Sequence, residues 1–151
     1  MRLDDRAEII ELLTRYCEYL DEYDIDAVAT VFTEDYVFDP GPGNGGPLQG
    51  RDIIVAGQKE RMGRWRRSHH QIGQTRIEFT GDDTAHGVTY VIAWHQSWGN
   101  VSCIGRLRYV DDFVRAGGSW LISKRVLIEL GVEGFPEGTW NPLDRKVPAG
   151  H

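Results

Sequence analysis

The feature that most constrains the fold is a run of long strand patterns joined by short turns in the second half of the chain. Residues 84–98, 102–115 and 120–130 are rich in β-branched and aromatic side chains, which are typical of strands. The pair Gly117-Gly118 separates the second stretch from the third and is typical of a hairpin turn. Because short turns join strands that run in opposite directions, this half of the chain predicts an antiparallel sheet.

Helical patterns come before these strands. Residues 4–20 predict an amphipathic helix, whose apolar stripe contains Ala7, Ile10, Leu13, Cys17 and Leu20. Residues 25–32 and 51–63 predict two further helices, while residues 36–39 and 71–79 predict two further strands. Helices followed by a run of strands are typical of an α+β fold, in which the helices cover one face of the sheet. We therefore predict a cone in which a curved antiparallel sheet and N-terminal helices enclose one pocket.

The length of the chain suits one small domain. The 151 residues are 40% hydrophobic, which is enough to bury a core but leaves little room for a second domain. No linker interrupts the pattern, so residues 1–151 are predicted to form a single domain. Residues 131–151 predict an irregular C-terminal tail. Its aromatic residues Phe135 and Trp140 are expected to cover the pocket or to lie in a subunit contact.

Charge and cysteine content argue against several classes of protein. A net charge of −6 disfavours a nucleic-acid partner, and we interpret the one basic cluster, Arg61 to Arg67, as a solvated helix end. Two cysteines, Cys17 and Cys103, are too few for a disulfide framework, and no ligand spacing predicts a metal site. The sequence contains no signal-peptide pattern and no membrane span, so we expect a cytoplasmic protein without a membrane partner.

A carboxylate and a histidine are the candidate catalytic pair. Asp21 follows Cys17 by four residues and therefore projects near the apolar face of the first helix, where a carboxylate needs a partner. In an extended segment His69 and His70 point to opposite faces, and spacing does not decide which one turns inward. A histidine facing a buried carboxylate is arranged as a general base. On spacing alone, a solvated Asp21 and a structural histidine remain open alternatives.

Other side chains are candidates for the wall of the pocket. His95 lies in a strand pattern with apolar residues on both faces, so it belongs to the core or lines the pocket. Tyr16 lies about one helical turn before Asp21 and is either a core residue or a phenol available to a substrate carbonyl. Tyr109 is a second candidate phenol. The remaining candidate walls are Phe38, Trp94, Leu107 and Phe113.

Three segments of the chain resemble the SnoaL-like branch of the NTF2-like superfamily. They are Tyr-x-x-x-x-Asp at residues 16–21, EDYVFD at residues 34–39 and HHQIGQTRIEF at residues 69–79. The resemblance extends over residues 5–130 and is nearest to scytalone dehydratase-like and hexachlorocyclohexane dehydrochlorinase-like proteins. It implies an NTF2-like (cystatin-like) cone, a homotrimer or homodimer, and a base at His70 that Asp21 orients. It also implies that His95 is a second active-site histidine.

The sequence departs from this pattern where substrates are recognised. Two tyrosines that scytalone dehydratases place near the substrate carbonyl correspond to Leu20 and Pro40, and an asparagine corresponds to Tyr109. Tyr16 fits the tyrosine of bile acid 7α-dehydratases, whose additional aspartate corresponds to Ala93. The resemblance therefore implies a retained base and altered groups around the substrate.

These observations together predict a lyase without a cofactor. We expect a dehydratase-type elimination on a small, largely hydrophobic cyclic molecule, with Asp21 and His70 as the acid–base pair and no metal. One alternative is an isomerase or polyketide-type cyclase that uses the same base. The other is a non-catalytic subunit, like the β subunit of ring-hydroxylating dioxygenases.

Overall fold

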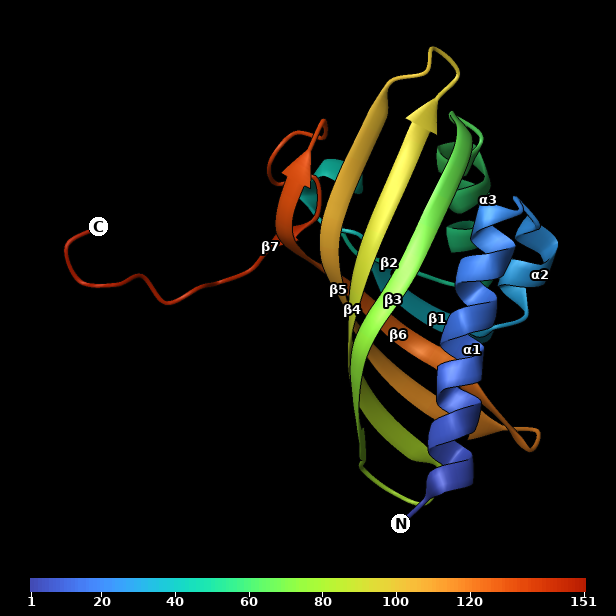
Figure 1. The fold of residues 1–151 in the computed structure, drawn as a ribbon. Helices are drawn as coiled ribbons and strands as arrows, with labels where there is room; N and C mark the ends of the chain where they lie inside the picture. Colours follow the sequence, from blue (N-terminus) through green and yellow to red (C-terminus); the bar gives the residue numbers. More distant parts are fainter.

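The computed structural model describes residues 1–151 and combines three α-helices with a seven-stranded sheet (Figure 1). No helix is both long enough and apolar enough to span a membrane. The helices are α1 (Leu3–Asp21), α2 (Ile25–Ala29), α3 (Arg51–Met62) and the 3₁₀ helix η1 (Pro42–Asn44). The strands are β1 (Phe32–Asp39), β2 (Leu48–Gln49), β3 (Trp65–Phe79), β4 (Thr84–Ser97), β5 (Ser102–Ala116), β6 (Ser119–Glu133) and β7 (Asn141–Pro142).

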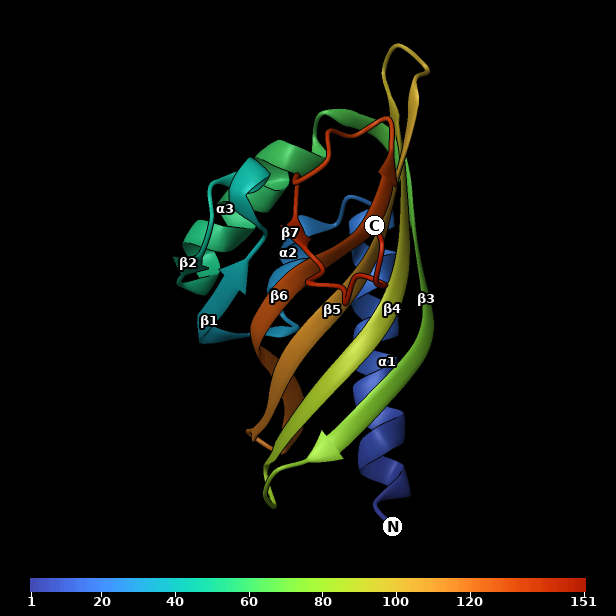
Figure 2. The same ribbon diagram turned by 90° about the vertical axis from the view of Figure 1, so that its left-hand side faces the viewer.

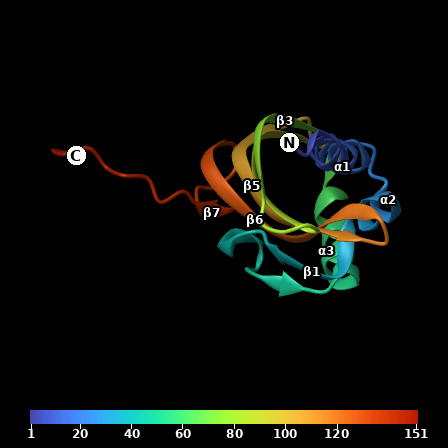
Figure 3. The same ribbon diagram turned by 90° about the horizontal axis from the view of Figure 1, so that it is seen from below.

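The sheet is mixed and mostly antiparallel, with the strand order β2-β1-β6-β5-β4-β3 and with β7 paired to β6. β1 and β7 run parallel to β6, whereas all other neighbours are antiparallel. Seen from below, the strands curve strongly and the helices lie on the open side of the curve (Figure 3). The register shifts in β3 between Trp65 and Arg67 and between Ile72 and Thr75, as in bulges that bend a strand. The predicted α+β fold class is confirmed.

Helix α1 carries the first catalytic candidate to the edge of the sheet. Its buried stripe, which includes Leu13 and Cys17, packs into the core, and the helix contacts β3 and β6. The helix ends at Asp21 because Tyr23 adopts a left-handed backbone conformation with φ 57°. Asp24 then caps α2 by accepting a hydrogen bond from the backbone N–H of Ala27 at 3.1 Å. The carboxylate of Asp21 is thereby held beside β3.

The strand predicted at residues 36–39 is present in β1, but its earlier start at Phe32 and its parallel pairing with β6 were not predicted. The helix expected at residues 25–32 ends at Ala29, and Phe32 begins β1 by pairing with Ile122 of β6. Phe32 stacks on Tyr36 with ring centroids 3.9 Å apart, and both side chains are buried. Burial of this aromatic pair favours strand over helix there, since tertiary packing outweighs local propensity.

Part of the expected irregular tail is ordered against the sheet. β6 continues to Glu133, and residues 134–143, which we call the C-terminal strap, lead into β7. Both oxygens of Glu129 accept backbone N–H groups of the strap, from Gly138 at 3.0 Å and from Trp140 at 3.1 Å. The Trp140 ring packs so closely on Gly105 that a Cβ there would lie 2.9 Å from it. The strap crosses the sheet in Figure 2, and the exposed residues after it extend away from the body in Figures 1 and 3.

Candidate active site

Asp21 and His70 form a hydrogen-bonded pair between the end of α1 and β3. His70 Nδ1 lies 2.6 Å from Asp21 Oδ1, and the backbone N–H of His70 donates to Asp21 Oδ2 at 2.9 Å. The hydroxyl of Ser68 donates to Asp21 Oδ1 at 2.8 Å. The His70 side chain is 6% exposed, whereas its neighbour His69 is exposed on the other face of the strand. The structure therefore resolves which of the two histidines turns inward.

The environment of Asp21 keeps its carboxylate charged. Partial burial raises the pKa of Asp21, but hydrogen bonds and charge from His70, with the hydroxyl of Ser68, outweigh burial and bring it below its ordinary value. An ionised carboxylate only accepts hydrogen bonds, so the ring proton of a neutral His70 lies on Nδ1. The other ring nitrogen, Nε2, is then free to accept a proton.

His95 lies beside this pair on β4. Its ring meets the ring of His70 almost perpendicularly, with an interplanar angle of 88° and centroids 5.1 Å apart. Trp65 and Phe135 also pack against it, with centroids at 5.0 and 5.7 Å. Burial and the nearby His70 lower the pKa of His95 to about 3, so its imidazole stays neutral at physiological pH. His95 Nδ1 has no hydrogen-bond partner within the protein.

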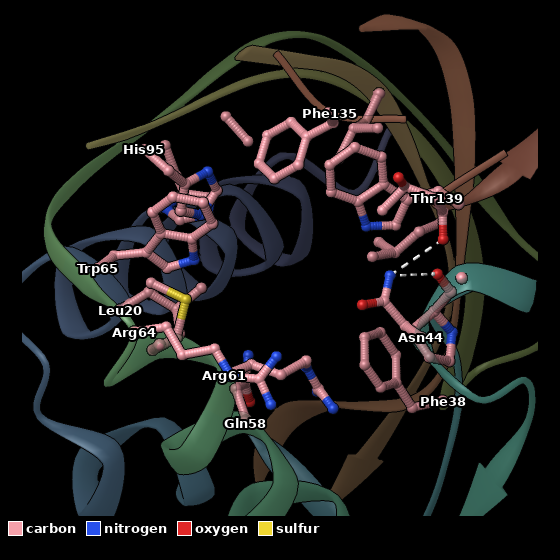
Figure 4. Close-up of a pocket in the computed structure, with 18 of the residues that line it drawn as sticks. Leu20, Phe38, Asn44, Gln58, Arg61, Arg64, Trp65, His95, Phe135 and Thr139 are labelled. Carbon is pink, nitrogen blue, oxygen red and sulfur yellow. Dashed lines mark hydrogen bonds between the residues drawn. The ribbon is translucent and has the colours of Figure 1, made fainter. Parts of the chain in front are cut away.

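These groups open onto a cavity of about 430 Å³ between the concave face of the sheet, helix α3 and the C-terminal strap (Figure 4). In this view His95 and Trp65 lie on one side, Phe38 and Asn44 lie opposite, and Phe135 faces Gln58 across the opening. The Asn44 side chain donates to the backbone carbonyl of Thr139 at 3.0 Å, which joins the loop around η1 to the strap. Residues from four parts of the chain thus enclose one chamber.

Two tyrosines lie at the inner end of the cavity over a buried ion pair. Arg125 donates to Asp111 through Nε and Nη2 at 2.7 and 2.8 Å, and neither side chain is exposed. The guanidinium carbon lies 4.4 Å from the ring centroid of Tyr16 and 3.8 Å from that of Tyr109. The Tyr16 hydroxyl accepts a 3.0 Å hydrogen bond from Gln58. Burial raises the pKa of Tyr16, so the phenol keeps its proton.

Most residues predicted for the pocket lie in its wall. The cavity is lined by Tyr16, Phe38, His70, His95, Leu107 and Tyr109, and Asp21 lies behind His70 rather than in the wall. Phe135 and Trp140 of the strap also line it, as expected for a cover over the pocket.

Two predicted wall residues lie elsewhere. Trp94 belongs to the outer face of β4, because the inward parity is that of Val91, Ala93 and His95. Phe113 is buried, but it packs in the core against Gly87, outside the residues that line the cavity. Both predictions were wrong, since apolar character and strand parity do not show which end or face of a curved sheet encloses the cavity.

Three of the wall residues that the sequence analysis missed lie on α3 and at the start of β3. Gln58 and Arg61 lie one turn apart on α3 and Trp65 begins β3, and all three line the cavity. The cluster from Arg61 to Arg67 was interpreted as solvated, which is wrong for Arg61. Simple alternation from His70 places Trp65 outside, but the bulge between Trp65 and Arg67 reverses the parity. The available signal in the sequence was Trp65 itself, an aromatic residue within a basic stretch, which favours a buried position.

No group of three His, Cys, Asp or Glu side chains is arranged to hold a metal ion. The side chains around the cavity are instead suited to proton transfer and to hydrogen bonding with an organic molecule.

Comparison with known proteins identifies the family. The SnoaL-like domain matches residues 1–126. The chain belongs to the SnoaL-like domain family. No curated protein matches the sequence.

Several solved structures share the fold over most of the chain. A candidate scytalone dehydratase from Novosphingobium aromaticivorans is 23% identical with a TM-score of 0.89, and the match covers 96% of this chain and 97% of that one. A candidate aromatic ring hydroxylase from the same species is 27% identical with a TM-score of 0.78, covering 92% and 99%. A hexachlorocyclohexane dehydrochlorinase from Novosphingobium barchaimii is 22% identical with a TM-score of 0.75, covering 87% and 90%. These likenesses show the NTF2-like fold expected from the sequence.

The positions at which the resemblance implies departures from the related enzymes lie in the cavity wall of this SnoaL-like chain. Leu20, Pro40, Ala93 and Tyr109 all line the cavity. The departures therefore alter the surface that a bound molecule would contact, while Asp21 and His70 remain paired.

Proposed function

We propose that this protein is a lyase that acts without a cofactor and eliminates a small leaving group from a largely hydrophobic cyclic molecule. His70 Nε2 removes a proton from a carbon next to a carbonyl or next to the carbon that bears the leaving group. The electron pair of the broken C–H bond forms the new double bond, and the leaving group departs as water or as a halide ion. The observation that carries this proposal is the hydrogen bond of 2.6 Å between His70 Nδ1 and Asp21.

Neutral donors beside the base complete the proposed reaction. The pKa of His95, lowered to about 3 by burial and by the nearby His70, keeps its imidazole uncharged, so it acts as a hydrogen-bond donor rather than a cation. Tyr16 accepts from Gln58 and retains its own O–H to donate. These neutral groups stabilise by hydrogen bonds the negative charge that develops on a carbonyl oxygen or on a departing hydroxyl, and the proton taken by His70 leaves with the hydroxyl as water.

The cavity supports a small hydrophobic substrate. Aromatic side chains form much of its wall, and Phe135 and Trp140 of the strap add to it. Since Leu20, Pro40, Ala93 and Tyr109 differ from the corresponding groups of the resembling dehydratases, we infer a substrate other than theirs.

A product-mass assay tests the proposal. The purified protein is incubated with cyclic β-hydroxy ketones and cyclic organohalides, and products are followed by mass spectrometry in H₂O and in D₂O. We expect loss of water or of hydrogen halide, with turnover reduced roughly 10²–10⁴-fold in His70→Gln. The matched control His69→Gln changes the exposed neighbour and retains turnover, since His69 points away from the cavity.

Other outcomes of the assay identify the alternatives. A product of unchanged mass that has gained solvent deuterium identifies an isomerase using the same base, and a closed ring of unchanged mass identifies a cyclase. No turnover, together with His70→Gln and Asp21→Asn variants that lose only stability or partner binding, identifies a non-catalytic subunit. Each of these three results contradicts elimination.

A further inference from the structure

We propose that Arg61 is the binding site for a carboxylate on the molecule that occupies the cavity, so that the substrate class is a hydrophobic cyclic acid. This inference deepens the proposed function and rests on it, because the bound acid is a substrate only if the protein is an enzyme. Binding of the carboxylate itself requires no turnover, so it can be tested separately.

Arg61 is the one arginine of its cluster that reaches the cavity without a partner. It lies in the last turn of α3 and is half-buried, and its side chain makes no hydrogen bond or ion pair with any other residue. By contrast, Arg64 pairs with Glu60 at 2.9 Å, Arg66 donates to Asn100, and Arg67 donates to Gln96 at 2.6 Å. An arginine withdrawn from water without a counter-charge is unfavourable, and an anionic ligand removes that penalty.

The wall around Arg61 leaves room for an anion. Glu137 of the strap is the only carboxylate among the lining residues, and it is exposed and makes no ion pair with Arg61. The guanidinium carbon lies 5.8 Å from the ring centroid of Phe38, so an aromatic face helps to hold the cation in place. The planar fork of an arginine matches the two oxygens of a carboxylate.

Gln58 gives a second, independent indication of a polar ligand on this wall. It lies three residues before Arg61, on the same side of α3, and is 6% exposed. Its amide nitrogen donates to Tyr16, whereas its Oε1 has no partner within the protein. A buried acceptor without a partner is unfavourable, so a donor on the ligand, such as a hydroxyl, satisfies it.

The polar wall lies across the cavity from an aromatic wall. In Figure 4, Arg61 and Gln58 lie on one side of the opening, and Phe135 lies on the other. Phe135 also packs on Trp65 and Trp140, with ring centroids at 5.7 and 5.0 Å. The two walls together select a molecule with an anionic group at one end and an apolar ring at the other.

Calorimetric titration with two matched probes tests this inference. At pH 7 the wild-type protein is titrated with 2-naphthoate and with 2-naphthamide, which replaces the carboxylate by a neutral amide of similar shape. We expect tighter binding of 2-naphthoate, by about tenfold or more. Arg61→Gln should lose this preference, and Arg61→Lys should retain part of it. The control Arg66→Gln removes the same charge at a residue that donates to Asn100 and lies outside the cavity wall, and should keep the preference.

The result that overturns the inference is equal binding of the two probes, or a preference that survives in Arg61→Gln. Absence of measurable binding of 2-naphthoate to the wild type overturns it as well. Thermal unfolding of each variant distinguishes loss of binding from loss of fold. If Arg61→Gln does not fold, Arg61→Lys, which keeps the charge, still tests the site. Failure of the proposed function gives a different result. If the protein prefers 2-naphthoate but eliminates no substrate, the lyase proposal is contradicted and the carboxylate site is not.

Discussion

The ring of His95 stands almost perpendicular to the ring of His70, with centroids 5.1 Å apart, and both side chains are largely buried. Two imidazoles this close are unfavourable as two cations. Burial and the neighbouring His70 both disfavour the charged form of His95, whereas Asp21 is hydrogen-bonded to His70. The proton taken from a substrate therefore resides on His70, and His95 serves as a neutral partner.

The buried His95 predicts loss of stability in acid. Its pKa of about 3 in the folded protein lies below the ordinary value of 6.5, so the unfolded chain binds more protons between these values. The contribution of His95 to stability is complete above pH 6.5 and is lost as the pH falls towards 3, at up to about 1.4 kcal/mol per pH unit. In His95→Phe the denaturant-derived free energy of unfolding should depend less steeply on pH over this window. Parallel pH curves for the two proteins would contradict the assignment.

The buried ion pair at the inner end of the cavity predicts a large effect of neutralising one partner. Asp111→Asn leaves the fully buried Arg125 without its counter-charge and should destabilise the fold by about 3–5 kcal/mol, measured by urea unfolding. The control Asp112→Asn acts on the adjacent carboxylate, which is half-exposed and pairs with His86, and should change stability by less than about 1 kcal/mol. Similar losses in both variants would show that the pair has no special role.

The two hydrogen bonds from the C-terminal strap to Glu129 predict a local opening in Glu129→Gln. A glutamine keeps one acceptor oxygen and places an amide donor against the second backbone N–H, so one strap contact is lost. Amide hydrogen exchange at Gly138 and Trp140 should accelerate, while exchange in the central strands stays unchanged. Glu133→Gln, at an exposed carboxylate paired with Arg106, is the control and should leave the strap protected. Unchanged exchange at both strap amides in Glu129→Gln would exclude this anchoring role.

Local patterns predicted the fold class and made Asp21 and His70 candidates, whereas their pairing followed only from the family resemblance. The helical spacing that ends at Asp21 and the strand parity around His70 are short-range features, and the resembling motifs cover both. The position of Trp94 was not predictable in the same way, since alternation separates two faces without showing which one the helices cover. Trp65 escaped prediction for a related reason: a bulge changes parity by one residue and leaves no pattern in the sequence.

The charge state of Asp21 provides a test of the contacts around it. In His70→Leu the imidazole contacts disappear while burial remains, so the pKa of Asp21 should rise from its lowered value. Ser68→Ala removes one hydrogen bond and should raise it less. Carboxyl ¹³C shifts followed against pH measure both effects. An Asp21 pKa that is unchanged in both variants would contradict the hydrogen bonds from His70 and Ser68 to Asp21.

The tautomer of His70 tests the central claim most directly, because a base in the cavity requires its ring proton on Nδ1 and a free Nε2. Long-range ¹H–¹⁵N spectra of the neutral imidazole identify the protonated nitrogen in the wild type and in Asp21→Asn. We predict that neutral His70 carries its proton on Nδ1 in the wild type, and that Asp21→Asn weakens this preference. A proton on Nε2 in the wild type, or a tautomer that ignores the substitution, would show that Asp21 does not prepare His70 as the base.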